Sequence, residues 1–199
     1  KFQNELIKLQ VNADKKKFIF EKDEHPRENL NLEDLKKLKT VFKENGTVTA
    51  GNSSGINDGA AATILMSREE AELRSIEPLV RIVSWAICGV EPSLMGLGPI
   101  SSVNMALKNA NWKIEDIDLF EINEAFAAQS IAVIKDLKIQ KEKVNVNGGA
   151  IALGHPIGAS GTRILTTLIH EMIRQNKAKG CATLCIGGGM GIAICIEKD

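Results

Sequence analysis

The stretch NGGAIALGHPIGASG, from Asn147 to Gly161, combines five glycines with one of the three histidines of the chain. An ordered glycine costs roughly 0.5–1 kcal/mol more in conformational free energy than alanine. So dense a run is expected only where the backbone turns tightly or another group approaches it closely. The stretch leads into residues 160–175, whose apolar side chains recur at helical spacing. The sequence thus predicts a shaped loop that places His155 just before a long amphipathic helix.

The overall composition excludes several classes of partner. The 199 residues include 25 basic and 25 acidic side chains, and 44% are hydrophobic, which is enough to fill a core. A net charge of zero argues against a broad basic surface for nucleic acid or an anionic membrane. No window of 18 apolar residues offers a membrane span. We therefore expect neither nucleic acid nor a membrane as a partner.

The cysteines point to a reducing compartment. None of the four forms a C-x-x-C pair, and the chain is too long for a small disulfide scaffold. Free thiols fit best, so we expect a cytoplasmic location, with mitochondria as the alternative. One histidine and one cysteine do not make the four ligands of a zinc site, and we expect no metal.

Strand and helix patterns alternate from residue 80 onward. Alternation of this kind predicts an α/β fold with parallel strands and right-handed crossovers, closed by a hairpin. The expected order is β-α-β-α-β-α-β-β, with a mixed five-stranded sheet covered by helices. The expected strands are residues 80–90, 116–123, 143–149, 181–187 and 191–198, and the expected helices are residues 99–110, 124–138 and 160–175.

The first part of the chain is more polar. Asn31 is a plausible N-cap for a helix with apolar residues at helical spacing. Residues 49–60 form a cluster of glycine, serine and asparagine, either a ligand-approach loop or an interdomain linker. Residues 61–67 resemble a buried strand, and Ser67 opens a short helix over residues 68–75 through a capping box. The apolar positions of the first helix are Leu32, Leu35, Leu38 and Phe42.

Three unusual segments follow predicted strands. Ligands of open α/β sheets bind beyond the carboxyl ends of the strands. Asn123, His155 and Cys185 lie in these segments, so all three can converge on one site. Each residue also has a purely structural alternative. His155 could be a buried histidine that only satisfies a hydrogen bond, and Cys185 could be a small core residue. Asn123 and Glu124 could cap the next helix.

The chemistry of such a group would be acid–base work beside a stabilised oxyanion. An unperturbed imidazole has a pKa of about 6.5, so His155 is mostly neutral at pH 7 and can accept a proton. Three consecutive glycines, 187–189, follow Cys185 closely. Their uncovered amides would suit an oxyanion beside the thiol.

Taken together, the motifs are far more specific than any one of them. The segments NEAFA, GGAIALGHPIGASG and CIGGGMGIA occur here in the order found in thiolases. The chain resembles the C-terminal half of a thiolase of the short-chain, acetoacetyl-CoA type. The resemblance also covers VFKENGTVTAGNSSGINDGAAA and GVEPSLMGLGP, and thus nearly the whole chain. It implies a layered thiolase fold, and a reversible Claisen condensation of two acetyl-CoA molecules through an acyl-cysteine.

The resemblance also implies roles for individual residues. His155 would activate the nucleophilic cysteine and help to hold the thioester oxygen. Cys185 would move the proton on the acetyl methyl carbon. Asn123 would hold a water in one oxyanion hole, and the Gly187 amide would contribute to the other.

The CoA thioester is expected to bind as substrate, with no further cofactor. By resemblance, Ser54, Ala50 and Phe42 would contact the pantetheine arm, and Met95 and Phe126 would line the acyl pocket. The family also implies a homo-oligomer, usually a dimer of dimers.

One family feature is missing from the sequence. The nucleophilic cysteine of thiolases lies in a C-x-S-G context in the N-terminal half, and no such motif occurs here. We therefore expect residues 1–56 to be the remainder of a CoA-covering loop domain. Residues 57–77 would belong to an absent N-terminal domain, and residues 78–199 would form the C-terminal domain. The chain alone is expected to be inactive, with the missing half of the same protein as its partner.

Three other functions are consistent with the same residues. The first is a 3-ketoacyl-CoA thiolase acting on longer chains, although Met95 and the IG of GHPIGASG resemble the short-chain type more. A non-catalytic fragment that binds CoA or only oligomerises would share the fold. A cysteine–histidine hydrolase would need a reactive thiol at Cys185.

Overall fold

The computed structural model describes residues 1–13 and 15–198, and its centre is a mixed sheet between two layers of helices. The sheet has the strand order β3-β6-β5-β4, in which β4 runs parallel to β5 while β6 runs antiparallel to both of its neighbours. The strands are β1 (Leu9–Ala13), β2 (Lys16–Phe20), β3 (Arg81–Gly89), β4 (Leu119–Ile122), β5 (Lys179–Ile186) and β6 (Met190–Glu197).

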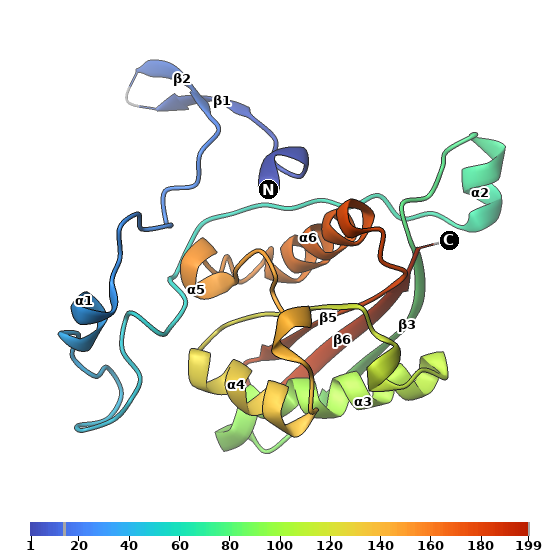
Figure 1. Cartoon of the computed structure of the whole chain (residues 1–199). Coiled ribbons are helices and arrows are strands. Elements are labelled where there is room, and N and C mark those ends of the chain that lie inside the picture. The colour runs from blue at the N-terminus through green and yellow to red at the C-terminus, as the bar shows by residue number, and fades with distance from the viewer. Residues whose placement is uncertain (14, 199) are drawn as a thin grey trace.

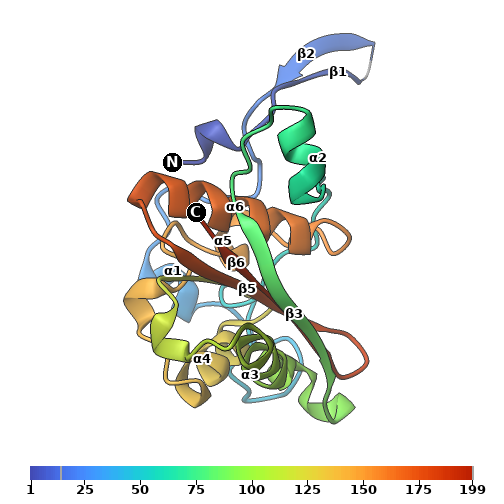
Figure 2. The same ribbon diagram turned by 90° about the vertical axis from the view of Figure 1, so that its right-hand side faces the viewer.

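Helices α3 and α4 cover one face of this sheet, and α5 and α6 lie on the other, as the two perpendicular views show (Figures 1 and 2). Short 3-10 turns complete the connections, among them η2 (Pro92–Leu97) before α3. The helices are α1 (Leu32–Lys36), α2 (Arg68–Leu73), α3 (Gly98–Ala110), α4 (Ala127–Asp136), α5 (Ala150–Leu153) and α6 (Ser160–Gln175).

Each layer of helices buries its own apolar cluster against the sheet. Val103 and Leu107 of α3 pack with Phe120 of β4 on one face. Ile164 and Leu168 of α6 pack on the opposite face, with Leu119, Ala182 and Ile196. Adjacent residues of β4 therefore point into different clusters, as the alternation of a strand requires. The layered α/β architecture predicted from the sequence is confirmed.

The strand predicted over residues 143–149 does not form. Within residues 143–149 only an isolated parallel bridge joins Val144 to Phe120. Asn145 has a positive φ of 46°, which breaks the extended chain. Its side-chain amide replaces a peptide group, because Oδ1 accepts from the Ile122 amide and Nδ2 donates to the Ile122 carbonyl, both at 2.8 Å. The sheet therefore has four strands, and a side chain continues its hydrogen bonding at the β4 edge.

The first 77 residues lie largely outside this packed body. A hairpin of β1 and β2 projects away from it, and α2 lies beyond α6 (Figures 1 and 2). The two predicted caps are confirmed: Asn31 Oδ1 accepts from the Asp34 amide, and Ser67 Oγ accepts from the Glu70 amide. The first helix is shorter than its apolar spacing suggested and ends at Lys36.

The predicted buried strand over residues 61–67 is also wrong. The segment has no regular structure, and the side chain of Ile64 is 87% exposed. A strand requires a neighbour to satisfy its backbone groups, and none of the described strands pairs with this segment. No helix in the described residues has the length and apolar character to cross a membrane.

Candidate active site

The carboxyl edge of the sheet brings Asn123 and His155 into contact. The Asn123 amide continues the parallel ladder by donating to the Thr183 carbonyl at 3.0 Å, which fixes the residue just beyond β4. Its side chain is 1% exposed, and Nδ2 lies 3.3 Å from Nε2 of His155. Asn123 Oδ1 is buried and has no hydrogen-bond partner among the described residues. Two of the three residues expected to converge on one site, Asn123 and His155, are therefore in contact.

Two further side chains hold His155. Its amide donates to Asn57 Oδ1 at 3.0 Å, and its ring Nδ1 lies 2.5 Å from Ser160 Oγ. Gly154, just before it, has a φ of +102°, and a Cβ there would lie 2.7 Å from Asn57 Cγ. Glycine at this position therefore lets residues 55–57 lie alongside the histidine, where Ile56 forms a parallel bridge with His155.

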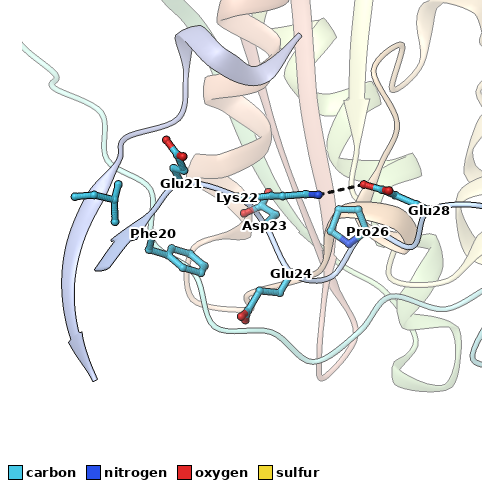
Figure 3. Close-up of a pocket in the computed structure, with 8 residues that line it drawn as sticks. Phe20, Glu21, Lys22, Asp23, Glu24, Pro26 and Glu28 are labelled. Atoms are coloured by element: carbon cyan, nitrogen blue, oxygen red, sulfur yellow. Dashed lines mark hydrogen bonds and ion pairs between the residues drawn. The ribbon is translucent and has the colours of Figure 1, made fainter. Parts of the chain in front are cut away.

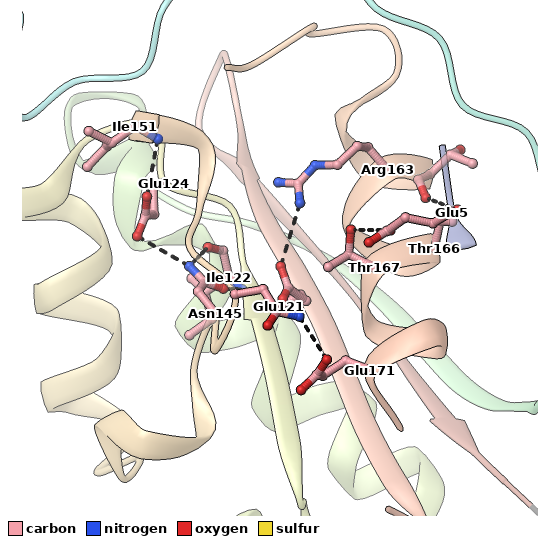
Figure 4. A network of polar contacts seen from close by, with 12 residues as sticks. Glu5, Glu121, Ile122, Glu124, Asn145, Ile151, Arg163, Thr166, Thr167 and Glu171 are labelled. Carbon is pink, nitrogen blue, oxygen red and sulfur yellow. Dashed lines mark hydrogen bonds and ion pairs between the residues drawn. The ribbon is translucent and has the colours of Figure 1, made fainter. Parts of the chain in front are cut away.

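Arg163 and Glu121 form a largely buried ion pair, and the charge of Arg163 acts on His155. Arg163 Nη1 of α6 lies 3.7 Å from Glu121 Oε2 of β4, and Figure 4 shows the pair beside Glu5 and Thr167. Desolvation raises the pKa of Glu121 to about 8, although the Arg163 charge opposes this shift. Desolvation, followed by the positive charge of Arg163, lowers the pKa of His155 below its ordinary 6.5. The imidazole is therefore neutral at pH 7 and able to accept a proton.

Cys185 lies near the same edge on β5, two residues beyond Thr183. Its side chain is buried, and desolvation raises the pKa of the thiol, so it is a neutral thiol at pH 7. Within the described residues, no hydrogen bond joins Cys185 to His155 or Asn123. The structure therefore places Cys185 at the same edge but does not join it to the histidine.

The tip of the β5–β6 hairpin carries the glycines. Gly187 is exposed, and a Cβ built on it would meet nothing within 4 Å. Gly188 and Gly189 have φ values of +90° and +92°, which residues other than glycine rarely adopt. The Gly187 amide thus lies at an open turn directly after β5.

Residues 52–54 lie against the start of α4, near Phe126, which was expected to line the acyl pocket. Ser54 donates its amide to the Ala125 carbonyl at 3.0 Å, and Ser53 forms an antiparallel bridge with Phe126. The rings of Phe42 and Phe126 meet edge to face, with centroids 5.7 Å apart, although Phe42 is 73% exposed.

The remaining two residues expected to bind the substrate are Ala50 and Met95. Ala50 is exposed on the turn that Asn52 closes on Thr49. Met95 is half-buried in η2, next to Gly96, where a Cβ would lie 2.8 Å from Gln129 of α4.

Capping of α4 by Asn123 or Glu124, an alternative from the sequence, is wrong. The N-cap of α4 is Phe126, and no side chain caps it. Glu124 instead accepts from the Ile151 amide at 3.2 Å and from Asn145 Nδ2 at 3.4 Å (Figure 4). A Cβ on Gly149 would lie 2.3 Å from the Glu124 carboxyl carbon, which explains one glycine of the decisive stretch.

Sequence reasoning missed Asn57, Ser160 and Arg163. Asn57 was one of several polar residues in a glycine-rich loop, and Ser160 was an ordinary small residue at a helix start. The only available signal for Ser160 and Arg163 was their spacing from His155, five and eight residues along the chain, which places them at the beginning of the following helix.

Two cavities lie away from these residues. One of about 700 Å³ lies between residues 62–82 and α6, and includes Ile169 and His170. The other, of about 510 Å³, is formed by residues 19–28 beyond the hairpin, where Lys22 pairs with Glu28 (Figure 3). Among the described residues, no cluster of three histidine, cysteine or carboxylate side chains is arranged to hold a metal ion.

Comparisons with known proteins assign the chain to a family. The family model described as "Thiolase, C-terminal domain" matches residues 76–198, and the one described as "Thiolase, N-terminal domain" matches residues 1–69. An acetyl-CoA acetyltransferase from Shinella zoogloeoides is 57% identical over 198 residues, which is 100% of this chain and 50% of that protein.

Solved structures agree. The crystal structure of the Bacillus anthracis acetyl-CoA acetyltransferase has a TM-score of 0.97 and 48% identity, over 100% of this chain and 50% of that chain. The human mitochondrial 3-ketoacyl-CoA thiolase in complex with CoA has a TM-score of 0.86 and 42% identity, over 96% and 48% of the two chains. The chain thus spans about half the length of the relatives it matches. From its sequence motifs, its layered sheet and the matching family models, the chain belongs to the thiolase family.

Proposed function

We propose that this chain supplies the acid–base part of an acetyl-CoA acetyltransferase, which reversibly condenses two acetyl-CoA molecules into acetoacetyl-CoA and free CoA. The observation that carries the proposal is the contact of Asn123 with a neutral His155 at the carboxyl edge of the sheet. The names of the matched acetyl-CoA acetyltransferases support this reaction over others in the family.

In the proposed first step, His155 accepts the proton of a nucleophilic cysteine supplied by the rest of the protein. The thiolate attacks the thioester carbonyl of acetyl-CoA, and the CoA sulfur leaves with the proton of the Cys185 thiol. The acetyl group stays on the cysteine, Cys185 becomes a thiolate, and His155 keeps the proton that it accepted. The lowered pKa of His155 suits this role, because a base that is already protonated at pH 7 could not accept the proton.

In the second step, Cys185 acts as the base toward the methyl carbon of a second acetyl-CoA. The resulting enolate attacks the acetyl-cysteine, forms the new carbon–carbon bond and releases the cysteine as a thiolate, which takes its proton back from His155. Asn123, through a water, and His155 would stabilise the enolate oxygen, and the Gly187 amide would stabilise the tetrahedral oxyanion. The raised pKa of Cys185 makes the thiol its resting form, so in this proposal its proton passes to the departing CoA sulfur in the first step, which leaves the thiolate that the second step needs as a base.

The CoA arm would enter beside residues 49–57. Ser54 is fixed there through its amide, and the Phe42–Phe126 pair presents an exposed aromatic face to an apolar chain. We propose that Ser54, Ala50 and Phe42 contact the pantetheine and that Met95 and Phe126 line the acyl pocket. CoA thioesters are then the only small-molecule partners that the reaction needs.

The nucleophilic cysteine is proposed to lie outside these 199 residues, so the chain alone would not turn over. The proposed partner is the other half of the same protein, assembled as a homo-oligomer in the cytoplasm. The division into residues 1–56, 57–77 and 78–199 stays a prediction.

The test uses this chain mixed with the half of the Shinella zoogloeoides relative that it does not match. The rate of acetoacetyl-CoA thiolysis is measured for the His155→Ala and His170→Ala variants of this chain in that mixture. We expect His155→Ala to lower kcat by about 10²–10⁴-fold, the usual contribution of a positioned general base. His170→Ala, further along α6, is the matched control and should leave kcat unchanged. Equal rates for both variants would contradict the proposal, and faster thiolysis of a ten-carbon substrate would indicate a long-chain thiolase.

A further inference from the structure

We propose that Ser160 is a positioning residue that fixes the tautomer of His155, with the proton on Nδ1 and the lone pair of Nε2 directed at Asn123. No role for Ser160 follows from the sequence motifs. The inference concerns this chain's own hydrogen bonds, and its importance for catalysis rests on the proposed function.

The Ser160 hydroxyl has a single hydrogen to donate. Ser160 Oγ lies 2.9 Å from the Pro156 carbonyl oxygen, which can only accept, so the hydroxyl donates there. The same oxygen lies 2.5 Å from His155 Nδ1. Because its hydrogen is already used, Ser160 Oγ must accept at this second contact, and Nδ1 carries the proton.

The other side of the ring agrees with this assignment. Asn123 Nδ2 lies 3.3 Å from Nε2, and an amide nitrogen can only donate. Nε2 must therefore be the acceptor, as it is when Nδ1 carries the proton. The opposite tautomer would require two changes at once: Ser160 would give up its hydrogen bond to Pro156, and the Asn123 amide would turn over.

The position of Ser160 in the fold suits it to hold the imidazole ring of His155. It is the first residue of α6 and is almost completely buried, so water does not compete for its hydroxyl. Pro156 follows His155 directly, so the loop and the helix start are tied together by the same side chain that binds the imidazole. In a neutral histidine, the hydrogen bond at one ring nitrogen decides which form the other takes.

The consequence is a base that is prepared before substrate arrives. With the proton held on Nδ1, the basic lone pair is always on Nε2, at the edge where Asn123 lies. Loss of the Ser160 hydroxyl would leave Asn123 as the only side-chain partner of the ring among the described residues. The Asn123 amide could then turn over and accept from Nε2–H without opposition from Ser160, so both tautomers would be populated, and only one keeps the lone pair on Nε2.

The test is nitrogen-15 NMR of the imidazole rings in the 199-residue chain at pH 8, which requires no enzymatic activity. Protonated and unprotonated ring nitrogens give well-separated shifts. We expect wild-type His155 to be protonated at Nδ1 alone and Ser160→Ala to give a mixture. His25 and His170 serve as internal references for an intact fold. The matched control is Ser102→Ala, which removes another buried hydroxyl that donates to a proline carbonyl but does not contact a histidine.

A second variant separates Ser160 from Asn123. Asn123→Ala should retain the Nδ1-protonated form, because Ser160 still fixes it. A wild-type ring protonated at Nε2, an unchanged tautomer in Ser160→Ala, or a tautomer lost in Asn123→Ala would each overturn the inference.

In the complemented enzyme, Ser160→Ala should lower kcat by about 10–100-fold, as removal of a partner that orients a metal-bound histidine does, with KM unchanged. Failure of complementation would count against the proposed function and leave the NMR result standing.

Discussion

Residues 1–77 and residues 78–198 use the same apolar residue types with opposite results. In the second region, both faces of a sheet are covered, and Phe120 is 2% exposed. In the first region, Ala71 is the one buried side chain among the described residues, and Ile56 is 98% exposed. Apolar sequence therefore produces a core only where a second apolar layer is present to meet it. The candidate active site lies where the two regions touch, through Asn57 and Ser54.

The largest expected difference between the two regions is in the stability lost when one apolar side chain in each is truncated. Phe120→Ala should lower the free energy of unfolding by about 3–5 kcal/mol, because it leaves a cavity between α3 and the sheet. Ile64→Ala should change it by less than about 0.5 kcal/mol, because the side chain is exposed. Urea unfolding of both variants is the measurement, and a large loss for Ile64→Ala would mean that residues 61–67 do pack on the body.

A second prediction concerns the charge buried under the site. Between pH 4.5 and about 8, Glu121 keeps its proton in the folded chain but loses it in the unfolded chain. Rising pH therefore favours unfolding over this window, by on the order of 3 kcal/mol in total. Glu121→Gln cannot ionise, so its stability should vary less between pH 5 and pH 8.

Denaturant unfolding at pH 5, 6, 7 and 8 measures this effect. Glu33→Gln, on the exposed helix α1, is the control, and its pH dependence should match wild type. Parallel curves for wild type and Glu121→Gln would contradict the assignment of a protonated buried carboxyl.

A third prediction concerns the junction of the two regions. Asn57→Ala removes the acceptor of the His155 amide, and should cost about 0.5–1.5 kcal/mol locally. Hydrogen exchange of the His155 amide should become severalfold faster, while amides of β5 remain as protected as before. Asp58→Ala, the next residue in the loop, is the control. Unchanged exchange at His155 would show that the loop does not hold the histidine in solution.

The smallest expected effect is at an exposed helix. Ser67→Ala removes the cap of α2 and should cost about 1 kcal/mol of local helix stability. Because α2 is almost entirely outside the packed body, global unfolding should be unaffected. Faster exchange of the Glu70 amide with an unchanged urea midpoint is the expected pair of results. A shifted midpoint would mean that α2 unfolds together with the sheet.

The sequence predicted best where local pattern and tertiary packing agree. Residues 160–175 were expected as a helix and form α6 with the same bounds, because a full apolar stripe faces the sheet. Residues 143–149 and 61–67 read as strands from composition, yet one is interrupted by the left-handed Asn145 and the other lacks a neighbouring strand. The hairpin of β1 and β2 was not predicted, since its exposed residues show no buried alternation.

The site was predictable to the extent that strand order determines it. Asn123 and His155 were expected together because each follows a predicted strand, and they are in contact. The strand predicted before His155 does not form, so the order of the sheet places only Asn123. Ser160 and Asn57 could not be selected, because serine at a helix start and asparagine in a loop are common for purely local reasons. Only the spatial position of the imidazole distinguishes these two from similar residues elsewhere.

The account depends on an acid–base centre that is built in this chain but completed by the rest of the protein. The most direct test is steady-state thiolysis of acetoacetyl-CoA by the 199-residue chain, alone and mixed with the unmatched half of the Shinella zoogloeoides relative. The account predicts no turnover by the chain alone and turnover by the mixture. Turnover by the chain alone would contradict it, because the acyl group would then need no cysteine outside these residues.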